Sequence, residues 1–392
     1  GEQRMEKMAE YLAELVLAGL EGRTPKGMPE GICVEEIVKI SGENHMDYLL
    51  LGALLRTEGL SEEEKDILRE KVLGSMLFTG LQLQELKSLE EHMEKAKIPC
   101  QPMKGARMKF YYPSPFLREM SDIDILIHED FMEQAVEELL RMGYVLQQKV
   151  KHHDIYYKAP GIVVEAHRAM YDRTVDERQY AYFSDLSRAV RRKGFLYVYD
   201  FEAEDFYIYM IAHMAKHFYK RGCGIRNLVD IYMFRERFGE EMDASYLEKQ
   251  FAALGLSAFT EHMEKLTGIW LRGEGWDEFY RQLFDYMQGC GIYGKDENGI
   301  WNRFCEEGES SPESLKRWYH FPPYRYMVTY YPWLTKNPVI GRVLLPVAWG
   351  VRAVRGITCG RGRQKREMLK QIGDSQILIR QDIYRRLQLH FQ

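Results

Sequence analysis

The segment 122–127, Asp-Ile-Asp-Ile-Leu-Ile, is the feature that most constrains the fold of this chain. Side chains alternate between the two faces of a β-strand, so Asp122 and Asp124 share one face and the isoleucines share the other. The two carboxylates repel each other, and Asp is a poor strand former, so a chain tolerates this arrangement most readily when a cation lies between them. The ordinary alternative is a polar strand end exposed to water, and the neighbouring motifs decide between the two.

Helical patterns flank this strand on both sides. Apolar residues recur at helical spacing up to about residue 95, where Ser61 followed by three Glu residues predicts a serine-capped helix with an acidic first turn. The chain returns to helix from 202 to about 238, and most of the remainder is helical too. We therefore predict an α+β fold, in which a small mixed sheet is embedded between N-terminal and C-terminal helical regions. The expected units are a helical region 1–95, an α+β core 96–200, a substrate-side helical domain 201–310 and an aromatic, basic helical extension 311–392.

The expected core has short elements separated by turns. Gly143 ends a predicted helix, and Ala159-Pro160-Gly161 predicts a hairpin turn. The predicted elements are, in order, an extended run 98–103, a short helix 105–112, a strand 123–127, a helix 130–142 and strands 144–150, 155–158 and 162–167.

Composition narrows the class of protein. The 392 residues suffice for two or three structural units, and a net charge of -5 argues against an electrostatic nucleic-acid binder. The six cysteines are scattered without a Cys-x-x-Cys pair, which indicates neither a disulfide framework nor a zinc knuckle. We expect no signal peptide, and the longest apolar stretch, 343–349, is too short to cross a bilayer. We expect a reduced, cytoplasmic protein.

The C-terminal tail differs from the rest in charge. From Arg352 onward there are ten Lys or Arg residues against three acids. The favoured interpretation is a solvated helical face, and an anionic partner is the alternative. The tail, together with Trp333 and Trp349, would also suit an anionic membrane surface, which we regard as a minor alternative.

A third carboxylate completes the candidate site. Glu165 lies on a predicted strand whose opposite face is apolar, and a buried acid is costly unless it is paired or binds a metal. Asp122, Asp124 and Glu165 together could hold two Mg²⁺ ions about 3.5–4 Å apart, the arrangement used for phosphoryl displacement, with Mn²⁺ as an alternative. Asp122 and Asp124 would bridge the ions, and Glu165 would complete the catalytic site and help to deprotonate an acceptor hydroxyl.

A candidate phosphate site precedes the carboxylates. Gly105 ends an extended run and opens a helix, where free N–H groups attract an anion, and Lys104 adds a positive charge. Most glycines at such positions are simply turns. Arg118 could reach a triphosphate, but an ion pair with Glu119 or another acid is an equal alternative.

The order of these motifs resembles the DNA polymerase β-like nucleotidyltransferase superfamily, and within it a bacterial family of uncharacterised nucleotidyltransferases. The resemblance covers about residues 45–290 and rests on Lys104-Gly105, on Arg118-x-x-Ser121-Asp122-x-Asp124 and on Glu165. It implies transfer of a nucleoside monophosphate from an NTP with Mg²⁺ and release of pyrophosphate. It also implies nucleotide-binding roles for Lys104, Gly105, Arg118 and Ser121. The sequence departs from the family at Ala106, where Gly or Ser is usual.

A second polar group follows the core. His213 and His217 are spaced to share one helix face, and Arg226 and Asp230 follow. These four, with His167 on the strand face of Glu165, are candidate substrate-side residues. Ordinary hydrogen-bonded helix residues are the alternative, and a zinc site from His213, His217 and Asp230 is disfavoured. The histidines at 128, 152 and 153 are interpreted as surface residues.

Three functions remain open at this point. The first is a nucleotidyltransferase with an NTP donor and an unknown acceptor, a small molecule or a protein; a nucleic-acid acceptor is disfavoured by the net acidity, although the basic tail leaves it open. The second is an inactive nucleotide-binding or protein-interaction module on the same fold, for which Ala106 is the main support. The third is a metal-dependent glycosyltransferase, which lacks the expected preceding run of alternating strands and helices. The oligomeric state is not predicted.

Overall fold

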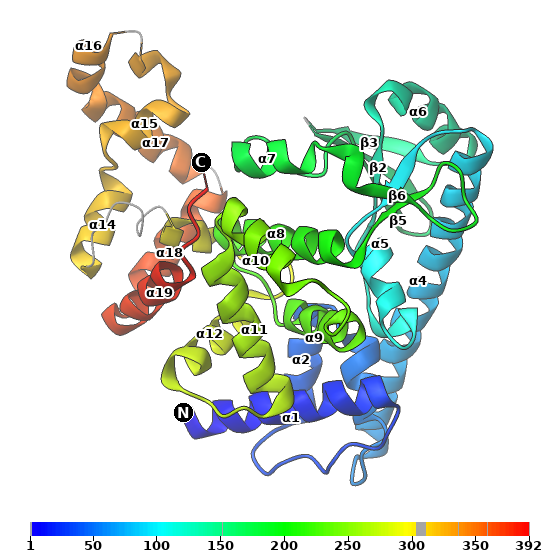
Figure 1. The fold of residues 1–392 in the computed structure, drawn as a ribbon. Coiled ribbons are helices and arrows are strands. Elements are labelled where there is room, and N and C mark those ends of the chain that lie inside the picture. The colour runs from blue at the N-terminus through cyan, green and yellow to red at the C-terminus, as the bar shows by residue number, and fades with distance from the viewer. Residues whose placement is uncertain (1, 151, 303–310, 336, 359, 392) are drawn as a thin grey trace.

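A five-stranded mixed sheet lies among many helices in the computed structural model (Figure 1). The structure describes residues 2–150, 152–302, 311–335, 337–358 and 360–391. The strand order is β1-β2-β5-β4-β3, with β2 and β5 parallel and the other neighbouring pairs antiparallel. The strands are β1 (Cys100–Pro102), β2 (Ile123–Ile127), β3 (Val145–Lys149), β4 (His153–Lys158) and β5 (Ile162–His167). A small hairpin of β6 (Ala189–Arg191) and β7 (Tyr199–Phe201) lies beside it.

The apolar face of the sheet is covered by α4 (Glu62–Lys95) and α6 (Met132–Arg141). The isoleucines of β2 pack there with Leu86, Leu89 and Leu139 from the two helices, and all of these side chains are buried. Ser61 caps α4 as expected, since its hydroxyl accepts from the N–H of Glu64, whose carboxylate accepts from the N–H of Ser61. The period-two pattern of the isoleucines therefore fixes which face of the sheet is buried against helices.

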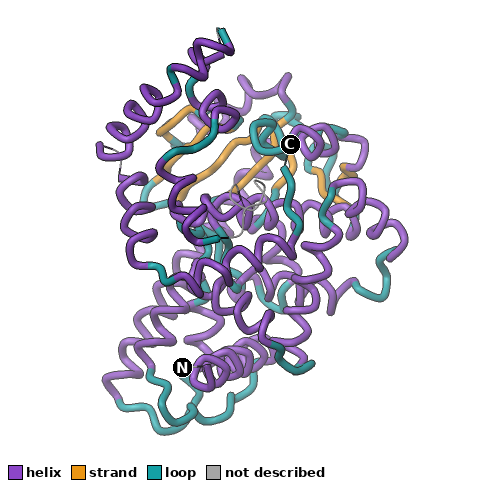
Figure 2. Tube along the Cα trace, turned by 90° about the vertical axis from the view of Figure 1, so that its left-hand side faces the viewer, coloured by secondary structure: helices purple, strands orange, loops and turns teal. Residues whose placement is uncertain are grey.

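The remaining helices form the larger body below and beside the sheet. They are α1 (Glu2–Glu21), α2 (Val34–Asn44), α3 (Gly52–Leu54), α5 (Gly105–Met108), α7 (Glu177–Phe183), α8 (Ala203–Arg221), α9 (Arg226–Phe238), α10 (Ala244–Leu254), α11 (Ser257–Arg272) and α12 (Glu278–Cys290). Their apolar side chains form a second, larger core. Turned by 90°, the tube view shows the strands in the upper part of the molecule with helices around and below them (Figure 2).

The expected helical region from 202 to about 238 consists of two helices, because the chain breaks between α8 and α9. Gly222 ends α8 with φ of 76°, a conformation that favours glycine. A Cβ on Gly224 would lie 2.2 Å from Oδ1 of Asn44, and the same oxygen accepts from the N–H of Ile225 at 3.0 Å. The break turns α9 back toward the cleft that α8 lines.

The C-terminal segment has two parts. Its helices are α14 (Pro312–His320), α15 (Tyr324–Tyr330), α16 (Pro338–Val343), α17 (Leu345–Thr358), α18 (Gly360–Gln371) and α19 (Asp374–Leu387). Helix α19 packs on the body, where the hydroxyl of Tyr384 donates to the main-chain oxygen of Phe218 at 3.0 Å. Helices α15 to α17 instead stand away from the body, at the upper left of Figure 1. In the part of the chain that is described, no helix has the length and apolarity needed to span a membrane.

Candidate active site

Three carboxylates meet on the polar face of the sheet. Strands β2 and β5 run parallel with Asp124 directly beside Glu165, and Asp122 lies one pleat before Asp124. Asp122, Asp124 and Glu165 each offer a carboxylate oxygen, and these ligand atoms lie within 4.8 Å of one another. Hard carboxylate oxygens at this spacing fit a divalent cation such as Mg²⁺. The residues that the sequence pattern selected for metal binding can therefore act together.

A lysine and a histidine hold Asp124. Its Oδ1 accepts from Nζ of Lys104 at 2.5 Å and lies 2.7 Å from Nε2 of His167. Although burial alone would raise the pKa of Asp124, Lys104 and His167 hold it well below its usual value. Burial and the neighbouring Asp124 raise the pKa of Asp122. The site thus has a shortage of positive charge at Asp122, which a bound cation would supply.

Histidines support Glu165 from behind the carboxylates. Nε2 of His167 lies 3.3 Å from one oxygen of Glu165, and Nε2 of His153 lies 3.7 Å from the other. Burial raises the pKa of Glu165, but the hydrogen bond from His167 and the charges of Lys104 and His153 together outweigh this, and the net pKa is lowered. The interpretation of His153 as a surface residue is wrong, because it pairs with His167 across β4 and β5 and stacks on its ring at 4.8 Å between centroids. Alternation along β4 puts the side chain of His153 on the same face of the sheet as His167. The sequence could not show this, because it depends on which strand pairs with β4.

The Lys104-Gly105 turn forms one edge of the site. Lys104 has φ of 51° and ψ of -126°, a sparsely populated conformation that costs a non-glycine residue about 1–3 kcal/mol. Gly105 is required by close packing, since a Cβ there would lie 2.9 Å from Cβ of Met120. Ala106 is fully buried in the core between the sheet and α4, so a hydroxyl at that position would not face the site. The departure at Ala106 therefore carries little weight against activity.

Arg118 and Asp230 form a buried bidentate ion pair. Nε and Nη2 of Arg118 donate to the two carboxylate oxygens of Asp230, each at 2.9 Å, and the hydroxyl of Tyr112 donates to Oδ1 at 2.8 Å. The sequence left open whether Arg118 reaches a triphosphate or pairs with an acid. In the structure it pairs with Asp230 and not with the carboxylate of Glu119. Asp230 is thereby occupied, and it forms no metal-binding cluster with His213 and His217 among the described residues. The zinc interpretation is not supported.

Arg226 lies beside this pair with spare hydrogen-bonding capacity. Its Nη1 donates to the main-chain oxygen of Glu119 at 3.1 Å, and its buried Nε has no hydrogen-bond partner among the described residues. Burial, followed by the charge of Arg118, lowers the pKa of Arg226 to about 10. The same two arginines, after burial, lower the pKa of His45 to about 4. This wall of the site is electropositive and suits an anion.

A cleft of about 300 Å³ joins the acidic and the basic sides. It is lined by every candidate residue except His167, which lies behind Asp124: Lys104, Gly105, Arg118, Ser121, Asp122, Asp124, Glu165, His213, His217, Arg226 and Asp230. On α8, Nε2 of His213 lies 3.1 Å from Nε2 of His217, and burial lowers the pKa of both far enough to keep them neutral. The carboxylates from β2 and β5 thus face α8 and α9 across one cavity.

Residues that sequence patterns did not select complete the mouth of the cleft. Tyr293 lines it, and its hydroxyl donates to Oγ of Ser121 at 2.6 Å. Oγ of Ser121 also lies 3.3 Å from Nδ1 of His45, whose ring packs edge-on against Tyr293. Tyr209 on α8 lines the interior. An isolated Tyr among 26 carries no motif, so these residues had no sequence signal.

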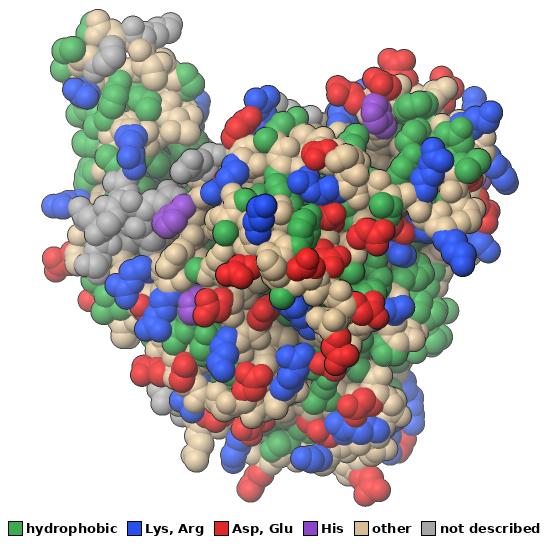
Figure 3. Space-filling model, viewed as in Figure 1, with side chains coloured by type: hydrophobic (Ala, Val, Ile, Leu, Met, Phe, Trp, Pro, Cys, Tyr) green, Lys and Arg blue, Asp and Glu red, His purple; other side chains and the backbone are tan. Residues whose placement is uncertain are grey.

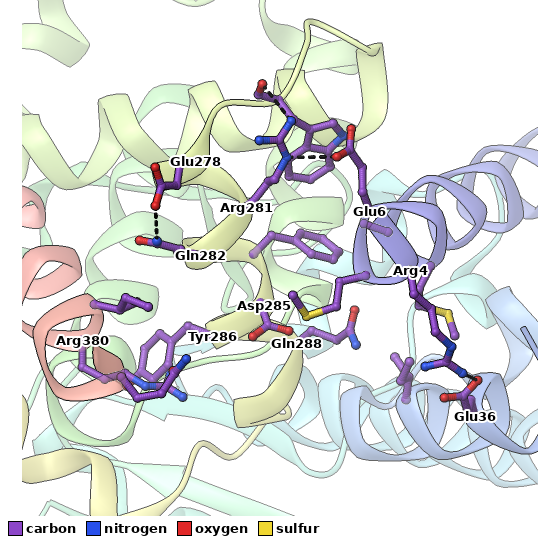
Figure 4. A pocket seen from close by; sticks show the side chains of 18 residues that line it. Arg4, Glu6, Glu36, Glu278, Arg281, Gln282, Asp285, Tyr286, Gln288 and Arg380 are labelled. Carbon is purple, nitrogen blue, oxygen red and sulfur yellow. Dashed lines mark hydrogen bonds and ion pairs between the residues drawn. The ribbon is translucent and has the colours of Figure 1, made fainter. Parts of the chain in front are cut away.

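A second cavity, of about 440 Å³, lies between α1, α12 and α19 (Figure 4). Its charged side chains are largely paired with one another, as Arg4 with Glu36 and Arg281 with Glu6. In the described part of the chain two groups could hold a metal, Asp122 with Asp124 and Glu165, and His153 with Glu165 and His167, and neither lines this second cavity. The cleft between the sheet and α8 is therefore the better candidate active site.

Comparison with protein families agrees with this geometry. A family model described as "Uncharacterised nucleotidyltransferase" matches residues 34–272. The chain belongs to this family. As a member of the nucleotidyltransferase family it is an enzyme of nucleotidyl transfer, and the matched region contains the sheet, α8, α9 and nearly all of the cleft. No significantly similar sequence was found among curated proteins, and no significantly similar fold among solved structures.

Proposed function

We propose that this nucleotidyltransferase moves a nucleoside monophosphate from an NTP to a hydroxyl of a small molecule or a protein, with release of pyrophosphate. The observation that carries the proposal is the division of one cleft into an acidic side and a basic side. A metal–polyphosphate substrate has the complementary division, with a cation for the carboxylates and phosphates for the arginine. The residues at both sides come from the family-matched region.

The acidic side supports a metal-dependent reaction. Bound by Asp122, Asp124 and Glu165, two Mg²⁺ ions, or Mn²⁺ in their place, would stabilise the charge that develops on the phosphate and acceptor oxygens. The acceptor hydroxyl oxygen attacks the α-phosphorus. The bond between the α-phosphorus and the oxygen that bridges it to the β-phosphate breaks, and pyrophosphate leaves. The carboxylate of Glu165, held ionised by His167, is positioned to take the hydroxyl proton.

The basic side supports binding of the donor phosphates. Arg226 has a buried guanidinium with an unused donor at Nε, which a phosphate oxygen would satisfy. Arg118 lines the same cleft but is held by Asp230, so we assign it to positioning the wall rather than to the triphosphate. Lys104 lines the same cleft and contacts Asp124 at 2.5 Å, and it would become available to the phosphates when a metal takes up Asp124.

The mouth of the cleft supports a binding place for a base or an acceptor ring. Tyr293 is held by Ser121 and His45 and is 57% exposed, so one face of its ring remains accessible. Aromatic rings held in this manner stack on bases with little loss of entropy. Ser121 thereby acts through Tyr293 in this proposal.

The test begins with the donor. Titration with each of the four NTPs in the presence of Mg²⁺ should give binding, and an acceptor panel should give pyrophosphate release that requires the metal. Asp124→Asn should reduce release by at least about 100-fold, because it removes one of three carboxylates from the metal-binding site. Asp130→Asn is the matched control, since Asp130 has an 81% exposed side chain away from the cleft.

Three outcomes would contradict the proposal. NTP binding that survives in an Asp122→Ala, Asp124→Ala variant, with no turnover over a broad acceptor panel, would favour an inactive binding module. Binding of sugar nucleotides but not NTPs would favour a glycosyltransferase. Equal pyrophosphate release by wild type and Asp124→Asn would remove the carboxylates from the reaction.

A further inference from the structure

Helices α16 and α17 expose a continuous set of apolar side chains. On α17, Val347, Val351, Val354 and Ile357 recur at spacings of four, three and three, which places them on one face of the helix. Val339, Ile340 and Val343 on the preceding α16 extend the set. The most exposed members are Val343 at 73%, Val339 at 71%, Ile357 at 64%, Val354 at 62% and Val347 at 56%. We call these residues, with Ile340 and Val351, the apolar stripe.

Helices α15, α16 and α17 form a projecting lobe, and the stripe is not needed to hold this lobe together. The opposite side of α17 makes the internal contacts, with Ala348 buried beside Met327, Tyr331 and Leu334. Arg352, one turn after Ala348, donates to the main-chain oxygen of Tyr319 at 2.7 Å. The lobe therefore has its own small core, and the stripe faces outward from it. Figure 3 shows green apolar side chains with scattered blue ones on this projecting lobe.

The charged residues in this part of the sequence are of one sign. Residues 314–366 contain eleven Lys or Arg and no Asp or Glu, although the whole chain has a net charge of -5. An acid-free stretch of this length in an acidic protein creates a local positive field. The segment lies outside the region that matches the family, so the nucleotidyltransferase core does not account for it.

We propose that this lobe docks on a lipid bilayer surface that contains anionic headgroups. The stripe would enter the boundary between headgroups and acyl chains, and the basic residues would meet the lipid phosphates. Charge selects this occupant over a second copy of the chain, because two acid-free, basic segments repel each other face to face. The small aliphatic side chains of the stripe also offer nothing that stacks on nucleic-acid bases. This surface is independent of the proposed reaction.

Co-sedimentation of the full chain with vesicles tests the proposal. Phosphatidylcholine vesicles that contain phosphatidylglycerol should bind the protein, binding to pure phosphatidylcholine should be at least about ten-fold weaker, and added salt should weaken the former. The variant Val347→Asp, Val354→Asp, Ile357→Asp should reduce binding at least about ten-fold, because it places acids among exposed residues that would enter the bilayer. Its circular dichroism and NTP binding should match wild type, since all three side chains are exposed.

The matched control is Leu73→Asp, Leu77→Asp on α4, on the far side of the molecule from the lobe (Figure 1). These leucines are 51% and 58% exposed, and their replacement should leave vesicle binding unchanged. Absence of wild-type binding to the anionic vesicles, equal binding to both vesicle types, or equal loss in the control would overturn the proposal. So would a lipid-free dimer in sedimentation velocity that the stripe variant abolishes, because it would assign the stripe to a second copy. Equal vesicle binding by the stripe variant and wild type would also overturn the proposal, because the stripe would then not contact the bilayer.

Discussion

The ion pair between Arg118 and Asp230 should stabilise the protein chiefly by fixing the basic wall of the cleft to the sheet. The two residues are 112 positions apart, and their side chains are only 7% and 5% exposed. Asp230→Asn would keep the size of the side chain and remove its charge. Arg118 would then be a buried cation without its carboxylate partner, beside the second cation of Arg226.

The geometry sets the expected magnitude. Removing one partner of a buried pair costs about 3–5 kcal/mol, whereas loss of one hydrogen bond costs about 1 kcal/mol. We therefore expect Asp230→Asn to lower the free energy of unfolding by about 3–5 kcal/mol. Tyr112→Phe, which removes one neutral donor to the same carboxylate, should cost about 1 kcal/mol.

Urea unfolding followed by circular dichroism measures these changes. Asp230→Asn, Arg118→Gln and the double variant form a cycle, and the double variant should be about 2–3 kcal/mol more stable than the sum of the single losses predicts. Additive losses, or a cost below about 1 kcal/mol for Asp230→Asn, would refute the structural role. If Asp230→Asn kept wild-type stability but lost NTP binding, Asp230 would instead be a substrate ligand.

Two other substitutions test the charges around the cleft. Lys109 is fully buried, its Nζ has no hydrogen-bond partner among the described residues, and burial followed by the charge of Arg118 lowers its pKa to about 7. Below pH about 7 the folded protein bears the full cost of burying this charge, and the cost declines as the pH rises toward the ordinary lysine value of about 10.4. Lys109→Met should therefore raise the free energy of unfolding by about 1–3 kcal/mol at pH 6 and by much less at pH 9.5. Urea unfolding at both pH values measures this. A gain in stability that does not depend on pH would contradict the prediction. Arg226→Gln should weaken NTP binding at least about ten-fold in calorimetric titration, because it removes a donor that a phosphate would use. The free energy of unfolding should stay the same or rise, because the substitution removes a buried cation. Unchanged NTP affinity would exclude Arg226 from phosphate binding.

The core of the fold could be predicted because its signals are local. Strands 123–127 and 162–167 occur as predicted, and their alternation correctly separated the isoleucines from the carboxylates. The predicted strand 155–158 starts two residues earlier, at His153, and the predicted helix 130–142 starts at Met132 after a short 3₁₀ turn. Ends of elements depend on caps and on neighbouring strands, which weak local preferences do not specify.

The partners within the site could not be predicted. Arg118 contacts an acid because α9 brings Asp230 to it. The position of α9 follows from the break after Gly222, which the sequence did not specify. His153 and Tyr293 likewise reach the site through strand pairing and chain reversal, and neither belongs to a recognisable motif.

The sequence by itself determined the type of chemistry. Asp122 and Asp124 share a face because adjacent pleats alternate, and this holds in any fold that keeps the segment as a strand. Only the tertiary structure decided what surrounds them: Glu165 alongside through the register of β2 and β5, Lys104 and His167 on Asp124, and an arginine with an unused donor across the cleft. The physical reason is that charge interactions depend on distance in space, and the distances between segments far apart in the sequence are set by strand pairing and by how the two cores pack.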